Sequence, residues 1–375
     1  MKELQEILQR IEGLAPGERA ILATVVGVQG SGYRLAGARM LIDEDGKSIG
    51  TVSGGCLEAD IIERAKLRLN KEGPTVVVYD SIKDKDSIFG LQTGCRGLVR
   101  ILLEPAIDNG LFGFVRTCFS RRERGAIATL FSATNGTDLP IATRLFWLDG
   151  KKYEVAIKTG RGAIDDVALK IGQDADISIA EDRSRSVIYR TSKGELEFFI
   201  EVVKPPTSLL IFGAGHDALP LAEFAKRLGW CVTVIDHRPA FATANRFPRV
   251  DEVIVSRAAE LSDDVFSDLE SVAVVMSHNF QADRETLRRL FKSSCRYIGV
   301  LGPKQRTADL LRELRQEGMK FDKTALDRLH APVGLDIGAT TPEGIALSIV
   351  SEIQTVLADR DGGYLRDRKK PIYDR

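Results

Sequence analysis

The sequence has few cysteines for its length, no excess of charge of either sign and no long apolar run. Five cysteines in 375 residues are too few and too scattered for the disulfide framework of a secreted protein, which indicates a reducing cytoplasm. Lys+Arg and Asp+Glu both number 53, so no overall field would recruit nucleic acid or an anionic membrane. The apolar runs are only as long as strands, and residues 1–10 lack a signal-peptide core. We therefore expect a cytoplasmic protein that binds neither nucleic acid nor membrane.

The length allows two or three domains with ample hydrophobic core. Two consecutive prolines, Pro205 and Pro206, mark the clearest change of pattern along the chain. We expect an N-terminal domain at 1–204, a Rossmann-like domain at 205–360 and a charged, poorly ordered tail at 361–375. The predicted fold class is α/β, with a smaller, mixed and β-rich domain preceding a doubly wound parallel sheet.

Residues 208–238 have the pattern of a dinucleotide-binding unit. The apolar run 209–212 is typical of a parallel strand that is buried on both faces. A G-x-G-x-x-A turn follows, in which Gly213 permits the tight turn and Gly215 lets the backbone approach a pyrophosphate. A helix and a second strand come next, and Asp236 ends that strand, where a carboxylate would bond a ribose 2′-hydroxyl. The whole pattern predicts a Rossmann-type half.

Strands and helices alternate beyond this unit. Strands are expected at 252–255, 272–276, 297–301 and 332–335, and helices at 283–292, 306–317 and 345–357. The N-terminal half is predicted to hold helices at 4–11 and 57–69, strands at 20–28, 38–42, 48–52, 76–79 and 98–104, and several β-rich segments over 111–203.

The turn Ser53-Gly54-Gly55-Cys56 is the sharpest feature of the N-terminal half, because a strand leads into it and a helix follows. Free N–H groups and the helix dipole at this point favour a thiolate at Cys56. The same turn could hold a phosphate on its backbone N–H groups. The alternative is a small apolar cysteine that closes a tight turn; the two glycines, which clear space before the sulfur, favour the functional interpretation.

A second cysteine, Cys95, also lies between glycines, in Gly94-Cys95-Arg96-Gly97. Arg96 could lower the pKa of this thiol or bind an anionic ligand, and a plain turn is an equal alternative. Two such cysteines in one domain raise the expectation that they meet at one site. The chain has no C-x-x-C spacing, so we expect no structural zinc site.

Polar residues follow several strands of the predicted parallel sheet, where such folds bind ligands. They include His216, Asp236, His278 and the glycine loop at Gly302. His216 could instead cap the glycine turn, and a metal held by His216, Asp236 and His278 is a weaker alternative. The chain has no Tyr-x-x-x-Lys pair, so hydride transfer lacks an evident acid or base.

These motifs together resemble the xanthine dehydrogenase accessory factor family (XdhC/CoxI). The resemblance runs in order over nearly the whole chain and rests on the segments 50–58 (Gly-Thr-Val-Ser-Gly-Gly-Cys-Leu-Glu), 94–97 (Gly-Cys-Arg-Gly), 211–216 (Ile-Phe-Gly-Ala-Gly-His), 234–238 (Val-Ile-Asp-His-Arg), 277–279 (Ser-His-Asn), 297–302 (Tyr-Ile-Gly-Val-Leu-Gly) and 334–343 (Gly-Leu-Asp-Ile-Gly-Ala-Thr-Thr-Pro-Glu).

The resemblance implies a maturation factor that binds molybdenum cofactor (molybdopterin), supports its sulfuration with a cysteine desulfurase and delivers it to a xanthine dehydrogenase-type apoenzyme. It makes Cys56 and Cys95 the candidate sulfur- or metal-handling thiols. The candidate cofactor-binding residues are Ser53, Gly54, Gly55, Glu58, Arg96, Gly213, Gly215, His216, Asp236, His278 and Gly302.

Delivery of a cofactor, rather than catalysis, is the leading hypothesis. The rivals are an NAD(P)- or FAD-dependent oxidoreductase and a nucleotide-sensing regulatory module, both of which would use the Rossmann half directly. Asp236 favours an adenosine ribose and so supports these rivals or a mixed role. A homodimer is expected because closed two-fold assemblies are the commonest.

Overall fold

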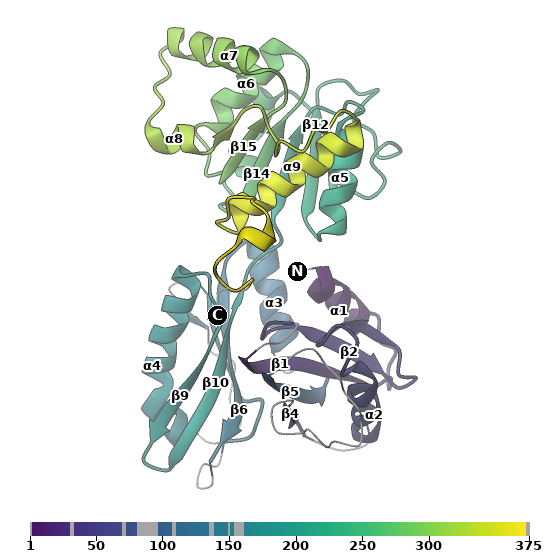
Figure 1. Cartoon of the computed structure of the whole chain (residues 1–375), viewed down its shortest axis with the longest axis vertical. Helices are drawn as coiled ribbons and strands as arrows, with labels where there is room; N and C mark the ends of the chain where they lie inside the picture. Colours follow the sequence, from purple (N-terminus) through teal and green to yellow (C-terminus); the bar gives the residue numbers. More distant parts are fainter. Residues whose placement is uncertain are drawn as a thin grey trace. The chain divides into compact units, whose positions relative to one another are not determined.

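The computed structural model describes residues 2–30, 34–69, 73–80, 97–106, 110–134, 139–148, 151–153 and 161–372. The chain forms two compact units, Glu3–Pro205 and Pro206–Arg375 (Figure 1).

The first unit contains two five-stranded sheets, and every strand pairing in them is antiparallel. The first sheet has the order β3-β2-β1-β5-β4 and the second the order β8-β7-β6-β10-β9. Their strands are β1 (Ala20–Gly30), β2 (Arg39–Asp43), β3 (Ser48–Gly50), β4 (Thr75–Asp80), β5 (Gly97–Pro105), β6 (Gly125–Ala133), β7 (Arg144–Leu148), β8 (Lys151–Tyr153), β9 (Arg185–Thr191) and β10 (Gly194–Val203).

Helices cover the outer face of each sheet of the first unit. Helix α2 (Glu58–Arg68) places Ile61 and Ala65 on the first sheet, because residues four apart share one side of a helix. Helix α4 (Arg161–Ala180) covers the second sheet in the same way through Ile171 and Ala175. Each sheet therefore has one face buried under its own helix, and α4 lies along β9 and β10 (Figure 1).

The inner faces of the two sheets share a core with α1 (Lys2–Glu12) and α3 (Leu111–Arg121). Three Arg–Glu pairs also join the sheets. Arg39 binds Glu201 and Arg144 binds Glu104 in buried bidentate contacts, and Arg100 binds Glu197 at 2.6 Å. Because removal of one partner would leave a charge buried and unpaired, these pairs favour this one arrangement of the two sheets.

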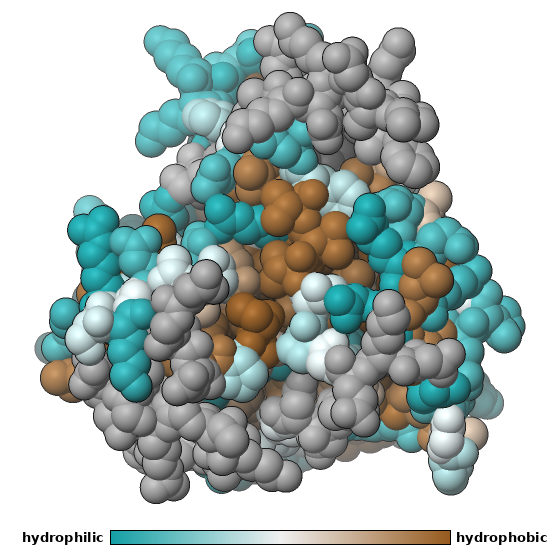
Figure 2. Space-filling model, turned by 90° about the horizontal axis from the view of Figure 1, so that it is seen from below, coloured by the Kyte–Doolittle hydropathy of each residue, from teal (hydrophilic) through white to brown (hydrophobic). Residues whose placement is uncertain are grey.

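Apolar side chains reach the surface of the first unit. Figure 2 shows apolar groups gathered near the centre of one face, with polar groups around them. The exposed large apolar side chains of this unit include Leu67, Val78, Leu169, Ile177 and Ile188. An apolar patch with polar groups around it, as Figure 2 shows, is typical of protein-binding regions.

The second unit is a doubly wound sheet of six parallel strands in the order β13-β12-β11-β14-β15-β16. Helices α5 and α9 pack on one face and α6 and α7 on the other. The elements are β11 (Ser208–Phe212), α5 (Ala218–Arg227), β12 (Cys231–Asp236), β13 (Glu252–Val255), β14 (Ser271–Val275), α6 (Phe280–Leu290), β15 (Tyr297–Val300), α7 (Lys304–Gln316), α8 (Lys323–Asp327), β16 (Leu329–His330) and α9 (Pro342–Leu357). Three short 3-10 turns lie at Ala258–Glu260, Asp263–Phe266 and Leu365–Asp367.

This topology confirms the predicted fold class, although the N-terminal unit is the longer of the two and not the smaller. Side chains of β11 alternate between the two faces, with Leu209 and Ile211 under α5 and α9 and with Leu210 and Phe212 under α6 and α7. The strand order reverses between β11 and β14, because the chain crosses from β13 over β12 and β11 before it enters β14. Open α/β sheets bind ligands at such a switch point.

Two details differ from the prediction. The segment 111–203 holds α3 and α4 as well as strands, whereas we expected several β-rich segments there and named no helix. The sixth parallel strand is Leu329–His330 and not 332–335. Pro332 has no N–H to donate to a neighbouring strand, which explains why the pairing ends before it.

Candidate functional site

The turn 51–57 joins β3 to α2 and requires both of its glycines. Gly54 and Gly55 have φ values of 88° and 119°, a region that other residues rarely adopt. A Cβ atom on Gly55 would meet no heavy atom within 4 Å. Gly55 is therefore needed for its backbone conformation and not to make room for a neighbour.

The carboxylate of Glu58, the first residue of α2, binds the inside of this turn. It accepts hydrogen bonds from the hydroxyl groups of Thr51 and Ser53. Its backbone N–H donors are Val52 (3.3 Å), Ser53 (2.8 Å), Gly54 (3.0 Å), Gly55 (2.8 Å) and Leu57 (3.2 Å). Partial burial alone would raise the pKa of this carboxyl, but the bonds from Ser53 and Thr51 outweigh burial and lower the pKa to about 2.

The N–H groups that we expected to hold a phosphate are therefore bound to a carboxylate of the chain itself. Glu58, predicted as a cofactor ligand together with Ser53, Gly54 and Gly55, is the internal partner of those three residues. The reason is local, because an acid in the first turn of a helix lies close to the N–H groups that precede it.

Cys56 follows the two glycines and is exposed, while Cys118 and Cys295 are buried and Cys231 is intermediate. The turn thus presents a thiol to solvent while Glu58 holds the backbone around it. Cys95 and Arg96 lie outside the described residues.

The second glycine turn follows β11 and comes very close to β14. Gly213 has a φ of 121°, and a Cβ atom there would lie 2.5 Å from the carbonyl oxygen of Met276. Ala214 donates its N–H to Asp236 at 2.8 Å. The turn is therefore fixed both by its neighbour strand and by the acid that ends β12.

Asp236 is buried, with 1% of its side chain exposed. Its carboxylate accepts bonds from the Arg238 backbone N–H (2.9 Å), Nε (2.9 Å) and Nη2 (2.7 Å) as well as from Ala214. Burial alone would raise the pKa of this carboxyl, but the bonds from Arg238 and Ala214 lower it to about 2. Both oxygens already have partners inside the chain, which differs from the expected free carboxylate that bonds a ribose.

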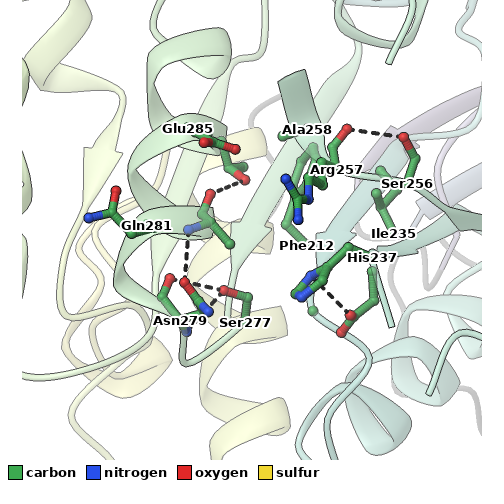
Figure 3. Close-up of a pocket in the computed structure, with 14 residues that line it drawn as sticks. Phe212, Ile235, His237, Ser256, Arg257, Ala258, Ser277, Asn279, Gln281 and Glu285 are labelled. Atoms are coloured by element: carbon green, nitrogen blue, oxygen red, sulfur yellow. Dashed lines mark hydrogen bonds and ion pairs between the residues drawn. The ribbon is translucent and has the colours of Figure 1, made fainter. Parts of the chain in front are cut away.

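A pocket of about 190 Å³ opens beside this turn, at the carboxyl ends of β11, β12, β13 and β14. Its lining includes the apolar residues Phe212, Ile235 and Ala258. Figure 3 shows His237 and Arg257 on the β12 and β13 side, and Glu285 on α6 across from them. The other lining residues are Gly213, Asp236, Ser256, Ser277, Asn279, Gln281, Ala282 and Thr286.

Only Gly213 and Asp236 of the predicted cofactor-binding residues line this pocket. His216 and His278 are exposed at the same rim, and His278 Nε2 lies 3.4 Å from Asp217 Oδ2. His278 also has a φ of 57°, which is uncommon for a residue with a side chain. Gly215 and Gly302 do not line the pocket. The described residues contain no group of three or more side chains that could hold a metal ion.

The sequence-based prediction missed Arg257, Gln281 and Glu285. Arg257 follows the strand β13, so the rule that places ligands at strand ends could have found it. Gln281 and Glu285 lie on α6. Asn279 is the N-cap of this helix, and its side-chain oxygen accepts a hydrogen bond from the Ala282 N–H. No sequence motif marks those two positions.

Fold and site together define the class: a two-unit α/β protein in which a Rossmann-type module follows a module with an exposed cysteine turn. A model of the XdhC Rossmann domain matches residues 209–353, and a model of the XdhC and CoxI family matches residues 14–80. A probable xanthine dehydrogenase subunit of Bacillus subtilis (strain 168) is 31% identical over 337 residues, which are 90% of this chain and 92% of that protein. The chain therefore belongs to the XdhC and CoxI family, as the resemblance predicted.

Two further relatives cover most of the chain. The molybdenum cofactor insertion chaperone PaoD of Escherichia coli (strain K12) is 22% identical over 92% of this chain and 86% of its own length. A crystal structure described as a xanthine dehydrogenase from Bacillus halodurans is 30% identical, with a TM-score of 0.74, and covers 96% of this chain and 97% of its own. In the part of the chain that the structure describes, no helix is long and apolar enough to cross a membrane.

Proposed function

We propose that this protein binds the molybdenum cofactor, supports its sulfuration and delivers it to a xanthine dehydrogenase-type apoenzyme. Family membership and the similarity to a molybdenum cofactor insertion chaperone support this role. The cofactor is cargo here, and the protein need not be a catalyst. Exposed apolar surface on the first unit suits a protein that has to contact a client enzyme.

The observation that carries the sulfur-handling role is the exposed thiol of Cys56 on a turn whose backbone is held by Glu58. A thiol exchanges sulfur only if its partner can reach it. A persulfide on a cysteine desulfurase would be attacked at its outer sulfur by the Cys56 thiolate. A new S–S bond then forms at Cys56, the old S–S bond breaks, and the donor cysteine leaves as a thiolate.

The remaining candidates stay part of the proposal, with Asp236 as a residue that shapes the pocket and not as a ribose ligand. Cys95 and Arg96 are proposed as a second thiol and an anion ligand of the same function. Gly213 and Asp236 shape the pocket of the second unit, and His216, His278 and Gly302 are proposed as further contacts at its rim. A cytoplasmic location and a homodimer stay predictions.

The replacement Cys56→Ser tests the sulfur-handling role. In cells that make the variant, the client hydroxylase should still contain molybdenum cofactor. The sulfurated fraction of that cofactor should be close to the fraction found in cells that lack this protein. The measurements are hydroxylase activity and cyanide-releasable sulfur per enzyme molecule. Cys231→Ser is the matched control, since Cys231 is only partly exposed, within β12. Wild-type sulfur content with Cys56→Ser would remove the proposed role of this thiol.

A second candidate function is an NAD(P)- or FAD-dependent oxidoreductase or a nucleotide sensor. The strand order 3-2-1-4-5-6 of the second unit and its glycine turn favour it, because this order is typical of dinucleotide-binding domains. The internal partners of Asp236 argue against the usual contact with a ribose. Mass spectrometry of the ligand that co-purifies with the protein separates the two: a pterin supports delivery, and a nicotinamide or flavin nucleotide supports the second candidate.

A further inference from the structure

Two opposite charges face each other across the pocket of the second unit. Arg257 enters from the end of β13, and Glu285 lies on α6 at the opposite side (Figure 3). Among the described residues, no hydrogen bond or ion pair engages the guanidinium of Arg257 or the carboxylate of Glu285. Both groups are therefore available to a ligand.

Neighbouring charges are already paired. Asp236 binds Arg238, Asp283 binds Arg306, and Arg289 binds Asp263 at 2.7 Å. The carboxylate of Glu285 and the guanidinium of Arg257 therefore differ from these neighbouring charges, which have partners. A pocket with an acceptor on one wall and a cation on the other favours a ligand that is a hydrogen-bond donor at one end and an anion at the other.

The size and floor of the pocket narrow the ligand further. Its lining includes the apolar residues Phe212 and Ile235, which suit a flat ring. The volume of about 190 Å³ is below the roughly 300–1,000 Å³ of most drug-sized sites. The pocket therefore fits one ring system with a short substituent and not a complete dinucleotide.

The geometry points to a 2-amino-4-oxo heterocycle that carries a phosphate: we propose that Glu285 accepts two N–H bonds from the edge of this ring and that Arg257 pairs with the phosphate. An amino group beside a ring N–H offers two parallel donors, which match the two oxygens of a carboxylate. Adenine and nicotinamide lack this pair of donors. Pterins and guanine both have it, and the pterin source rests on the proposed function.

Binding to the purified full-length protein tests the inference. The probes are neopterin 3′-phosphate and GMP, each measured by calorimetry against AMP and NAD⁺. We expect neopterin 3′-phosphate and GMP to bind at least about 10-fold more tightly than AMP and NAD⁺. The rings of AMP and NAD⁺ lack the pair of N–H donors, so the carboxylate of Glu285 would stay without a hydrogen bond in their complexes. Equal or tighter binding of AMP or NAD⁺ would overturn the inference.

Variants assign the two ends of the ligand. Glu285→Gln should weaken neopterin 3′-phosphate and GMP by about 10- to 100-fold. Glu223→Gln, which makes the same change at an exposed position of α5 outside the pocket lining, should leave both unchanged. Arg257→Gln should weaken the phosphorylated probe by about 10-fold but barely affect unphosphorylated neopterin. Unchanged affinities in Glu285→Gln would refute the role of Glu285, provided that circular dichroism shows a folded protein.

The experiment also separates the inference from the proposed function. Tight, Glu285-dependent binding of GMP without binding of the pterin supports the ring-edge chemistry but contradicts the cofactor as the ligand of this pocket. If neither probe binds while the protein still matures its client, the inference fails and the proposed function stands.

Discussion

The two glycine turns of this protein look alike in sequence and differ in what they leave open. Each follows a strand, precedes a helix and was expected to bind an anion, and in each the chain supplies a carboxylate to the backbone N–H groups. Glu58 comes from the helix that its own turn precedes and takes five backbone N–H groups. Asp236 comes from the next strand and takes one N–H from the glycine turn, that of Ala214.

The origin of the carboxylate decides what each turn can do. A local acid binds the backbone N–H groups of the first turn, so this turn presents the side chain of Cys56 and not a free set of N–H donors. Asp236, which comes from another strand, binds only one N–H group of the second turn, and a pocket opens beside this turn. A glycine turn before a helix is therefore an anion site only where no acid of the chain lies within reach of its N–H groups.

Alanine at Gly213 and at Gly55 offers the sharpest test of this comparison. The φ values are nearly the same, 121° and 119°, but a Cβ would strike Met276 O at 2.5 Å in the first case and open space in the second. Gly213→Ala should lower the free energy of unfolding of its unit by about 3–5 kcal/mol, and Gly55→Ala by about 1–2 kcal/mol. The difference between the two losses of unfolding free energy measures the steric contact with Met276, because the backbone strain is nearly the same in both variants.

Tryptophan fluorescence can follow each unit separately, because Trp147 is buried in the first unit and Trp230 in the second. The variants Trp230→Phe and Trp147→Phe therefore serve as single-tryptophan backgrounds for urea denaturation. Equal losses for the two glycine replacements would mean that β14 does not approach the second turn as closely as described.

Removal of the two carboxylates should destabilise the two units in the same order, with the larger loss below that of Gly213→Ala. Asp236→Ala leaves the Ala214 N–H and Arg238 without their buried partner and should lower the free energy of unfolding by about 2–4 kcal/mol. Glu58→Ala should lower it by about 1–3 kcal/mol, because water can reach the exposed turn and replace some of the lost bonds. The alkylation rate of Cys56 should also change in Glu58→Ala, whereas Asp236→Ala should leave it unaltered.

Urea denaturation and iodoacetamide labelling measure these effects. Glu223→Ala, at an exposed position of α5, is the control and should stay within about 0.5 kcal/mol. A larger loss in Glu58→Ala than in Asp236→Ala would contradict the view that the buried carboxylate matters more.

The second unit was predictable because its signals are local. An apolar strand, a glycine turn and an acid at the next strand end gave β11, α5 and β12 almost to the residue. In the first unit, α3 was missed because its aromatic and β-branched residues, with Gly113 in the first turn, resemble a strand. The contact between Arg39 and Glu201 spans 162 positions, and spacing along a sequence cannot show it.

The site follows the same rule. Gly213 and Asp236 could be named from a motif, and Arg257 from its place after a strand. The bond partners of Glu58 depend on the angle at which α2 leaves its turn, and the place of Glu285 depends on how α6 crosses the ends of the strands. The first is a local property of the turn and its helix, and the second is a property of the packed structure.

Acid titration gives the smallest effect and completes the comparison. The pKa of Glu58 falls from 4.5 to about 2 on folding, and that of Asp236 from 3.8 to about 2. Each lowered pKa adds stability that is complete above the unfolded value and is lost as the pH falls toward the folded value. The stability difference between wild type and Glu58→Gln should therefore shrink from about pH 4.5 downward in the first unit, and that for Asp236→Asn from about pH 3.8 in the second, each by on the order of 1 kcal/mol. Differences that do not vary with pH would show that the two turns are held by their shape and not by the ionised carboxylates.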